Sequence, residues 1–254
     1  METKNGGGIV KVVVALIAAA TAIVCVMILT KGFVGYKKSS GGGGLTATGS
    51  ASCDFESDLI VWRGSFSAYG MTTKEAYEII KNDTEVVKNY LLENGVTEDE
   101  LIFSSIDISQ RYRTEYDENG YYVRDYPDGY DLYQSVTVTS NNIDKVENIS
   151  RDITKLIEAG VQFSSYSPEY YCTKLDEVKL ELIEKATENA KQRIDIMAEG
   201  TGCKSGKLLT ANLGVFQITA KNSGSGEYTY DGAFDTSSRY KTAMITVRLN
   251  YEAE

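Results

Sequence analysis

The residues best suited to binding or chemistry are concentrated between Tyr112 and Tyr133. These 22 residues contain seven tyrosines and four aspartates. A tyrosine joins an apolar ring to a hydrogen-bonding hydroxyl, a combination that protein interfaces and glycan-binding surfaces use. A long β-hairpin with cross-strand tyrosine pairs would explain the same pattern without a binding role. The candidate interaction surface consists of Tyr112, Tyr116, Tyr121, Tyr122, Tyr126, Tyr130 and Tyr133.

Acidic residues in the same segment support an enzymatic alternative. A glycoside hydrolase needs two carboxyl groups, about 5–5.5 Å apart in retaining enzymes and about 6.5–9.5 Å apart in inverting ones. Asp125, Asp128 and Asp131 could supply such a pair. The alternative function is therefore a carboxylate-dependent hydrolase of cell-wall glycan.

The chain contains no histidine, which excludes Ser-His-Asp and Cys-His nucleophile systems and His-ligated metals. Residues 117–120 (DENG) resemble part of a calcium loop but lack its final glutamate, and a type I′ turn at Asn119-Gly120 explains them equally. The glycines in residues 222–226 lack the Lys-Ser/Thr of a phosphate loop. We therefore predict no catalytic residue, no cofactor and no metal, and we expect that the protein is not an enzyme.

Three cysteines lie beyond the apolar N-terminal segment. If the expected helix between Cys172 and Cys203 is continuous, about 27 residues separate its ends by about 40 Å, too far for a disulfide. Cys53 could pair with either of them, and three reduced, buried thiols are the other interpretation.

Charge is distributed unevenly along the chain. Residues 1–38 hold five lysines and one acid, whereas the remainder holds 21 basic and 35 acidic residues, a net charge of −14. Such a surface repels phosphates and anionic headgroups. We therefore expect no nucleic-acid partner.

An uncharged apolar run covers residues 12–30. Nineteen helical residues span about 28 Å, which matches the core of a bilayer. The run continues past the small residues 18–22, which favours an uncleaved transmembrane anchor over a cleaved signal peptide. Residues 1–11 are then a short tail and residues 31–44 a Gly/Ser-rich tether. Two lysines precede the run and three follow it, a count that leans towards a cytoplasmic domain.

Residues 45–254 are expected to form one α+β domain. Apolar periodicity and capping signals predict helices over about residues 72–95, 143–159 and 173–199. Segments rich in β-formers predict two strands in residues 45–68 and further strands near residues 101–114, 130–139, 162–171, 207–220 and 240–251. Because strands outnumber helices, we predict an N-terminal transmembrane helix followed by a largely antiparallel sheet packed with about three helices.

Several motifs recur in a recognisable order. An opening strand, LTATGSASCDFESDLIVW, is followed by a helix that ends in LLENGV (91–96). The segment GYDLYQSVTVTSNNIDKV then leads to LIEAGVQF (156–163), whose first six residues echo LLENGV. The long helix and turn KATENAKQRIDIMAEGTGCKSGKLLTANLG (185–214) places Ala186 and Ala190 four residues apart, before Ala198, Gly202 and Leu208.

In this order and spacing the chain resembles the SIMPL-domain family of bacterial extracytoplasmic proteins over about residues 45–251. The resemblance implies an envelope-located α+β domain of poorly defined role, in some members linked to stress defence. It also implies self-association and no accepted catalytic residue. The tyrosine-rich segment and the missing catalytic apparatus are the basis for expecting that the domain binds a second copy or another envelope component. On this ground we expect an extracytoplasmic domain, against the lysine count.

Overall fold

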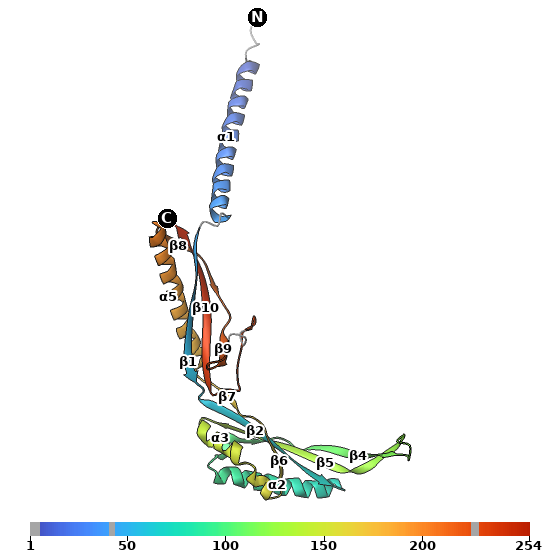
Figure 1. Cartoon of the computed structure of the whole chain (residues 1–254). Coiled ribbons are helices and arrows are strands. Elements are labelled where there is room, and N and C mark those ends of the chain that lie inside the picture. Colours follow the sequence, from blue (N-terminus) through green and yellow to red (C-terminus); the bar gives the residue numbers. More distant parts are fainter. Residues whose placement is uncertain (1–5, 41–43, 225–228) are drawn as a thin grey trace. The chain divides into compact units, whose positions relative to one another are not determined.

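The computed structural model describes residues 6–40, 44–224 and 229–254 (Figure 1). Helix α1 (Gly6–Ser40) contains the stretch Val13–Lys31, which by length and composition could cross a membrane. The helix is longer than the predicted anchor, so residues 31–40 of the expected tether are helical. No proline interrupts this stretch, and helix α1 ends just before the run of glycines at residues 41–44. Residues 1–5 of the tail and 41–43 of the tether lie outside the described residues.

The rest of the chain has the predicted α+β class, with antiparallel strands and several helices. It divides, together with α1, into two compact units. Residues 1–49, 190–212 and 248–254 belong to the first unit, and residues 50–189 and 213–247 belong to the second.

A six-stranded antiparallel sheet lies in the second unit. Its strands are β2 (Leu59–Gly70), β3 (Leu101–Phe103), β4 (Asp107–Tyr116), β5 (Tyr122–Ser140), β6 (Gln162–Ser165) and β7 (Glu169–Tyr171). The order is β3-β5-β2-β6, with β4 paired to β5 and β7 paired to β2.

Three helices connect these strands. Helix α2 (Thr73–Glu93) lies between β2 and β3, and α3 (Ile143–Asp152) and α4 (Lys155–Glu158) lie between β5 and β6. A β-α-β-β-α-β order with β5 between β2 and β3 is the topology of ferredoxin-like folds. The hairpin of β4 and β5 extends the connection between the second and third strands of that motif.

The remaining strands form a four-stranded sheet. They are β1 (Gly44–Glu56), β8 (Ser205–Leu213), β9 (Gln217–Ala220) and β10 (Tyr240–Ala253), in the order β1-β10-β8 with β9 antiparallel to β10. Helix α5 (Leu175–Thr201) precedes β8. Its buried residues recur every four positions and form an alanine-rich stripe: Leu182, Ala186, Ala190, Ile194 and Ala198.

Helix ends are set by local signals that the sequence contains. The Thr72 side chain accepts a hydrogen bond from the backbone N–H of Glu75, and the Glu75 carboxylate accepts one from Met71 N–H. Gly95 and Gly160, both at positive φ, end α2 and α4. In each case the N–H two residues beyond the helix cap bonds the carbonyl of a buried leucine, so the echo of LLENGV in LIEAGV is a repeated Schellman-type cap.

The helix predicted over residues 143–159 is interrupted. Between α3 and α4 the chain tightens through i to i+3 hydrogen bonds from Leu156 N–H to Ile153 O and from Ile157 N–H to Thr154 O. With this break, Ile153 and Leu156 are buried and Ile157 is exposed.

The core of the second unit lies between its six-stranded sheet and its helices. Helices α2 and α3 both contact β2 and β5. The Phe163 ring stacks on Trp62 at 5.9 Å and on Phe66 at 6.2 Å between ring centroids, and Gly64 leaves the space that this ring occupies. The other face of β2 carries Arg63, Ser65 and Ser67 together with the half-buried Leu59 and Val61, so it is more polar and more exposed than the core face.

Candidate functional site: a tyrosine-rich hairpin arm

The tyrosine-rich segment forms a β-hairpin that extends beyond the sheet. Strand β5 pairs with β2 only from Tyr130 onward, whereas residues 122–127 pair only with β4 among the described strands. We call residues 107–129 the hairpin arm. The ferredoxin-like sheet positions the arm because β5 is one continuous strand that belongs to both.

The turn of the arm differs from the predicted type I′ turn. Only Gly120 has a positive φ, of 82°, whereas a type I′ turn needs two such residues. Gly120 N–H donates to Asp117 O, and the Asp117 carboxylate accepts from Asn119 N–H and Tyr121 N–H. A type I turn followed by glycine in the left-handed region explains this geometry, and the acid is used to stabilise the turn.

Most of the candidate tyrosines are exposed to solvent. Tyr112, Tyr116 and Tyr121 are 57%, 62% and 72% exposed, and Tyr122 and Tyr133 are exposed as well. Nearly every residue of β4 is exposed, so neither face of the arm is covered. Tyr126 is half-buried, and Tyr130 packs against the core. All seven tyrosines of the predicted surface therefore lie on the hairpin formed by β4 and β5. Tyr130 differs from the others because it packs against the core.

Cross-strand contacts hold the two strands of the arm in register. Arg124 Nε of β5 lies 2.8 Å from Glu115 Oε2 of β4, and its guanidinium lies 6.0 Å from the centre of the Tyr126 ring on its own strand. Thr114 Oγ1 donates to Asp125 Oδ1 at 2.7 Å. Each such pair contributes about 0.2–1 kcal/mol, so the arm is ordered by surface pairs and not by a core.

The predicted acid pair does not take the form of two opposed carboxylates. Asp125, Asp128 and Asp131 follow one another along β5, where three residues of extended chain span about 10 Å. Asp125 accepts from Thr114, and Asp131 lies 3.8 Å from Arg111. These acids are arranged as pairing groups of a strand.

Sequence reasoning missed the arginines and the isoleucine of the arm. Arg111 and Arg113 flank Tyr112 in β4, and Arg124 lies between Tyr122 and Tyr126 in β5. Ile108 is exposed near the base of β4. Arg111 also lies 5.3 Å from the centre of the Tyr69 ring of β2. The Arg-Tyr-Arg spacing at 111–113 was a signal, because alternate residues of a strand share a face.

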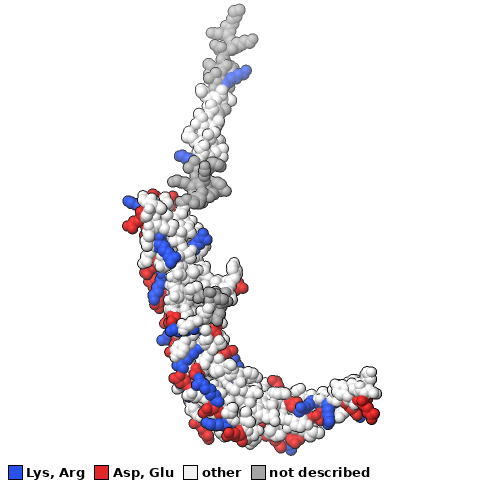
Figure 2. Space-filling view, in the orientation of Figure 1, with Lys and Arg blue, Asp and Glu red and all other residues white. Residues whose placement is uncertain are grey.

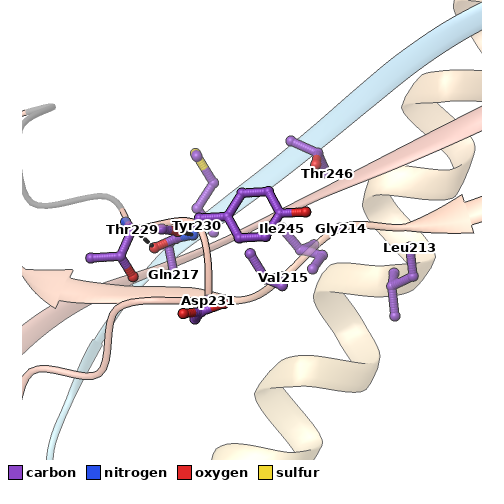
Figure 3. Close-up of a pocket in the computed structure, with 10 residues that line it drawn as sticks. Leu213, Gly214, Val215, Gln217, Thr229, Tyr230, Asp231, Ile245 and Thr246 are labelled. Atoms are coloured by element: carbon purple, nitrogen blue, oxygen red, sulfur yellow. Dashed lines mark hydrogen bonds between the residues drawn. The ribbon is translucent and has the colours of Figure 1, made fainter.

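A pocket of about 720 Å³ lies elsewhere in the second unit, beside β9 and β10 (Figure 3). Figure 3 shows the Tyr230 ring among the residues that line this pocket, and Tyr230 is 95% exposed. The buried Gln217 amide donates to Thr229 O and accepts from the backbone N–H groups of Thr229 and Ala233. Its polar atoms therefore fasten a loop and are not available to orient a ligand.

The cysteines that the structure describes are free thiols. Burial raises the pKa of the Cys53 and Cys172 thiols above its usual value. A raised pKa lowers the thiolate fraction, and only the thiolate is strongly nucleophilic. Cys53 and Cys172 are therefore expected to be weakly reactive structural thiols.

Comparison with protein families identifies the domain. The model of the SIMPL family, described as a protein of unknown function (DUF541), matches residues 45–252. The chain belongs to the SIMPL family. No curated protein matches the chain. The match includes all of β2–β9 and all but one residue each of β1 and β10, so the hairpin arm lies inside the family domain.

Proposed function

We propose that this protein is a membrane-anchored component of the cell envelope whose SIMPL domain binds a protein partner through the hairpin arm, without catalysis. The observation that carries the proposal is the exposure of Tyr112, Tyr116, Tyr121 and Tyr122 on a hairpin that no other described element covers. Aromatic residues are the commonest anchors of protein interfaces. The partner is either a second copy of the chain or another envelope protein.

Helix α1 supports the anchoring part of this proposal, because Val13–Lys31 is long and apolar enough to span a bilayer. We propose that the SIMPL domain lies on the extracytoplasmic side, as the family resemblance implies. Protease treatment of spheroplasts tests this placement. The domain should be digested without permeabilisation, and digestion only after permeabilisation would place it in the cytoplasm.

The arm can be tested by removing its exposed rings. The triple variant Tyr116→Ser/Tyr121→Ser/Tyr122→Ser should lose partner binding, because buried aromatic anchors often contribute 2 kcal/mol or more each at an interface. The fold should change little, since exposed cross-strand pairs contribute about 0.2–1 kcal/mol. A matched control, Tyr77→Ser/Tyr166→Ser, removes two exposed tyrosines outside the arm.

Photo-cross-linking of the full chain in membranes provides the measurement. A cross-linker at position 112 should give one defined adduct, which the triple variant loses and the control variant keeps. Light scattering of the detergent-solubilised chain shows whether the adduct is a second copy. Equal adducts from positions 77 and 112 would contradict the proposal, and so would an arm variant that unfolds.

A role in envelope or oxidative stress defence is part of the same proposal, and it follows from what the family resemblance implies for some members. Cells that lack the protein should be more sensitive to peroxide or to detergent. The wild-type chain should restore resistance and the arm variant should not. If the arm variant restored full resistance, the stress role would not depend on the arm.

A further inference from the structure

The outer edge of β4 is an open strand edge. Strand β4 has ten residues and pairs with β5 alone among the described strands. The ladder has two register shifts, between Gln110 and Tyr112 and between Glu115 and Tyr116, and each inserts its extra residue on β5, so β4 itself alternates regularly. In an antiparallel ladder, alternate residues direct both their N–H and C=O groups away from the neighbouring strand. An unpaired edge of this length is a template for another strand.

The position of Pro127 indicates which residues of β4 face outward. Pro127 lies opposite Tyr112 in the ladder and has no N–H to donate. It therefore fits a non-hydrogen-bonded pair, in which Tyr112 directs its backbone groups to the open side. Thr114, two residues further along, does the same. The other open edge of the arm, on β5, contains Pro127 itself and is the poorer template.

Charge indicates the kind of strand that fits. Between positions 107 and 129 the arm has six acids and three arginines, a net charge of −3. Figure 2 shows both charges on the arm, with uncharged surface between them. A second copy would bring an arm of the same sign, whereas a basic segment is complementary, and complementarity favours encounter and suppresses wrong partners.

We propose that β4 binds an extended basic segment of a different protein by strand addition, with the exposed side chains of Ile108 and Tyr112 giving side-chain contacts on one face of the new sheet. This inference rests on the proposed function and specifies its partner and its geometry. Backbone hydrogen bonds supply the affinity in this mode, and the charges of the arm select the partner.

Hydrogen exchange on the full chain in non-ionic detergent tests the geometry. The probe is an octapeptide of alternating lysine and valine. One control peptide alternates glutamate and valine. A second is the lysine peptide with N-methyl groups on every other residue, so that it keeps its charge but loses the N–H donors along one edge. The lysine peptide should slow exchange within residues 107–116 at least about tenfold, equivalent to about 1.4 kcal/mol. Neither control should do so.

A matched pair of variants tests the same edge from the protein side. Thr114→Pro removes an outward N–H and should weaken peptide binding at least about tenfold, whereas Thr114→Ala changes only the side chain and should bind normally. If Thr114→Pro fails to fold, the N-methylated peptide decides the question. Equal binding by the N-methylated and unmodified peptides would overturn strand addition.

The two proposals fail in different ways. Suppose that the tyrosine variant loses the membrane cross-link but the lysine peptide does not protect the β4 amides. The arm would then remain an interface, and strand addition would be rejected. A cross-linked adduct that is a second copy of the chain would reject the basic partner. Cross-links independent of the arm would reject the proposed function itself.

Discussion

Replacing Glu100 by glutamine is expected to destabilise the folded domain at neutral pH and to weaken its sensitivity to acid. Glu100 follows α2 in the short turn 98–100, and its carboxylate accepts from Thr97 N–H at 2.9 Å and from Lys145 Nζ at 2.9 Å. Lys145 also donates to Gly95 O, so this ion pair connects α3 to the end of α2. The Glu100 side chain is only 18% exposed.

The pKa of Glu100 gives the size of the effect. Burial raises this pKa, but hydrogen bonds from Ser140, Thr97 and Lys145 outweigh burial and lower it from 4.5 to about 2. Such a shift corresponds to about 3 kcal/mol at neutral pH, and screening by nearby water reduces the expected loss to about 1–3 kcal/mol. Because the folded pKa is depressed, this stability is present above about pH 4.5 and is lost as the pH falls towards about 2.

Urea unfolding followed by fluorescence of the fully buried Trp62, the single tryptophan, measures the difference. The gap between wild type and Glu100→Gln should be largest near neutral pH and should close as the pH falls below about 4.5. Glu98→Gln is the matched control, because Glu98 lies 2.8 Å from Lys88 but is 73% exposed, and it should change stability little. Equal effects of the two substitutions, or a gap that does not vary with pH, would refute the reasoning.

Two further substitutions test the packing and the loop. Gly64→Ala would place a Cβ 2.2 Å from Cζ of Phe163, and such overpacking should cost about 1–3 kcal/mol in urea unfolding; an unchanged midpoint would mean that the ring can move aside. Gln217→Ala removes the amide that bonds Thr229 and Ala233, which should cost about 1–3 kcal/mol and speed hydrogen exchange within residues 229–233. Exchange that speeds up equally throughout the six-stranded sheet would instead show that the loop and the core unfold together.

Local chemistry made part of this fold predictable. The ends of α2 and α4 are predictable from sequence, because a helix cap is formed by consecutive residues. In both helices a glycine follows four residues after a buried leucine whose carbonyl accepts the capping hydrogen bond. The alanine-rich stripe of α5 and the apolar run of α1 follow from periodicity and length. The SIMPL resemblance rested on the same local motifs, and the family match covers the expected range.

Long-range contacts decided the rest. Periodicity identifies apolar positions of a helix but not which of them another segment covers, and Ile79 of α2 and Met197 of α5 are exposed. The strand predicted near residues 130–139 is in fact continuous from Tyr122, because β4 pairs with its first half and β2 with its second half. The sequence alone determined the apolar N-terminal segment, the fold class and the cluster of tyrosines. Only the tertiary structure decided that this cluster forms an arm exposed on both faces, because exposure depends on which distant segments lie against a strand and not on the strand itself.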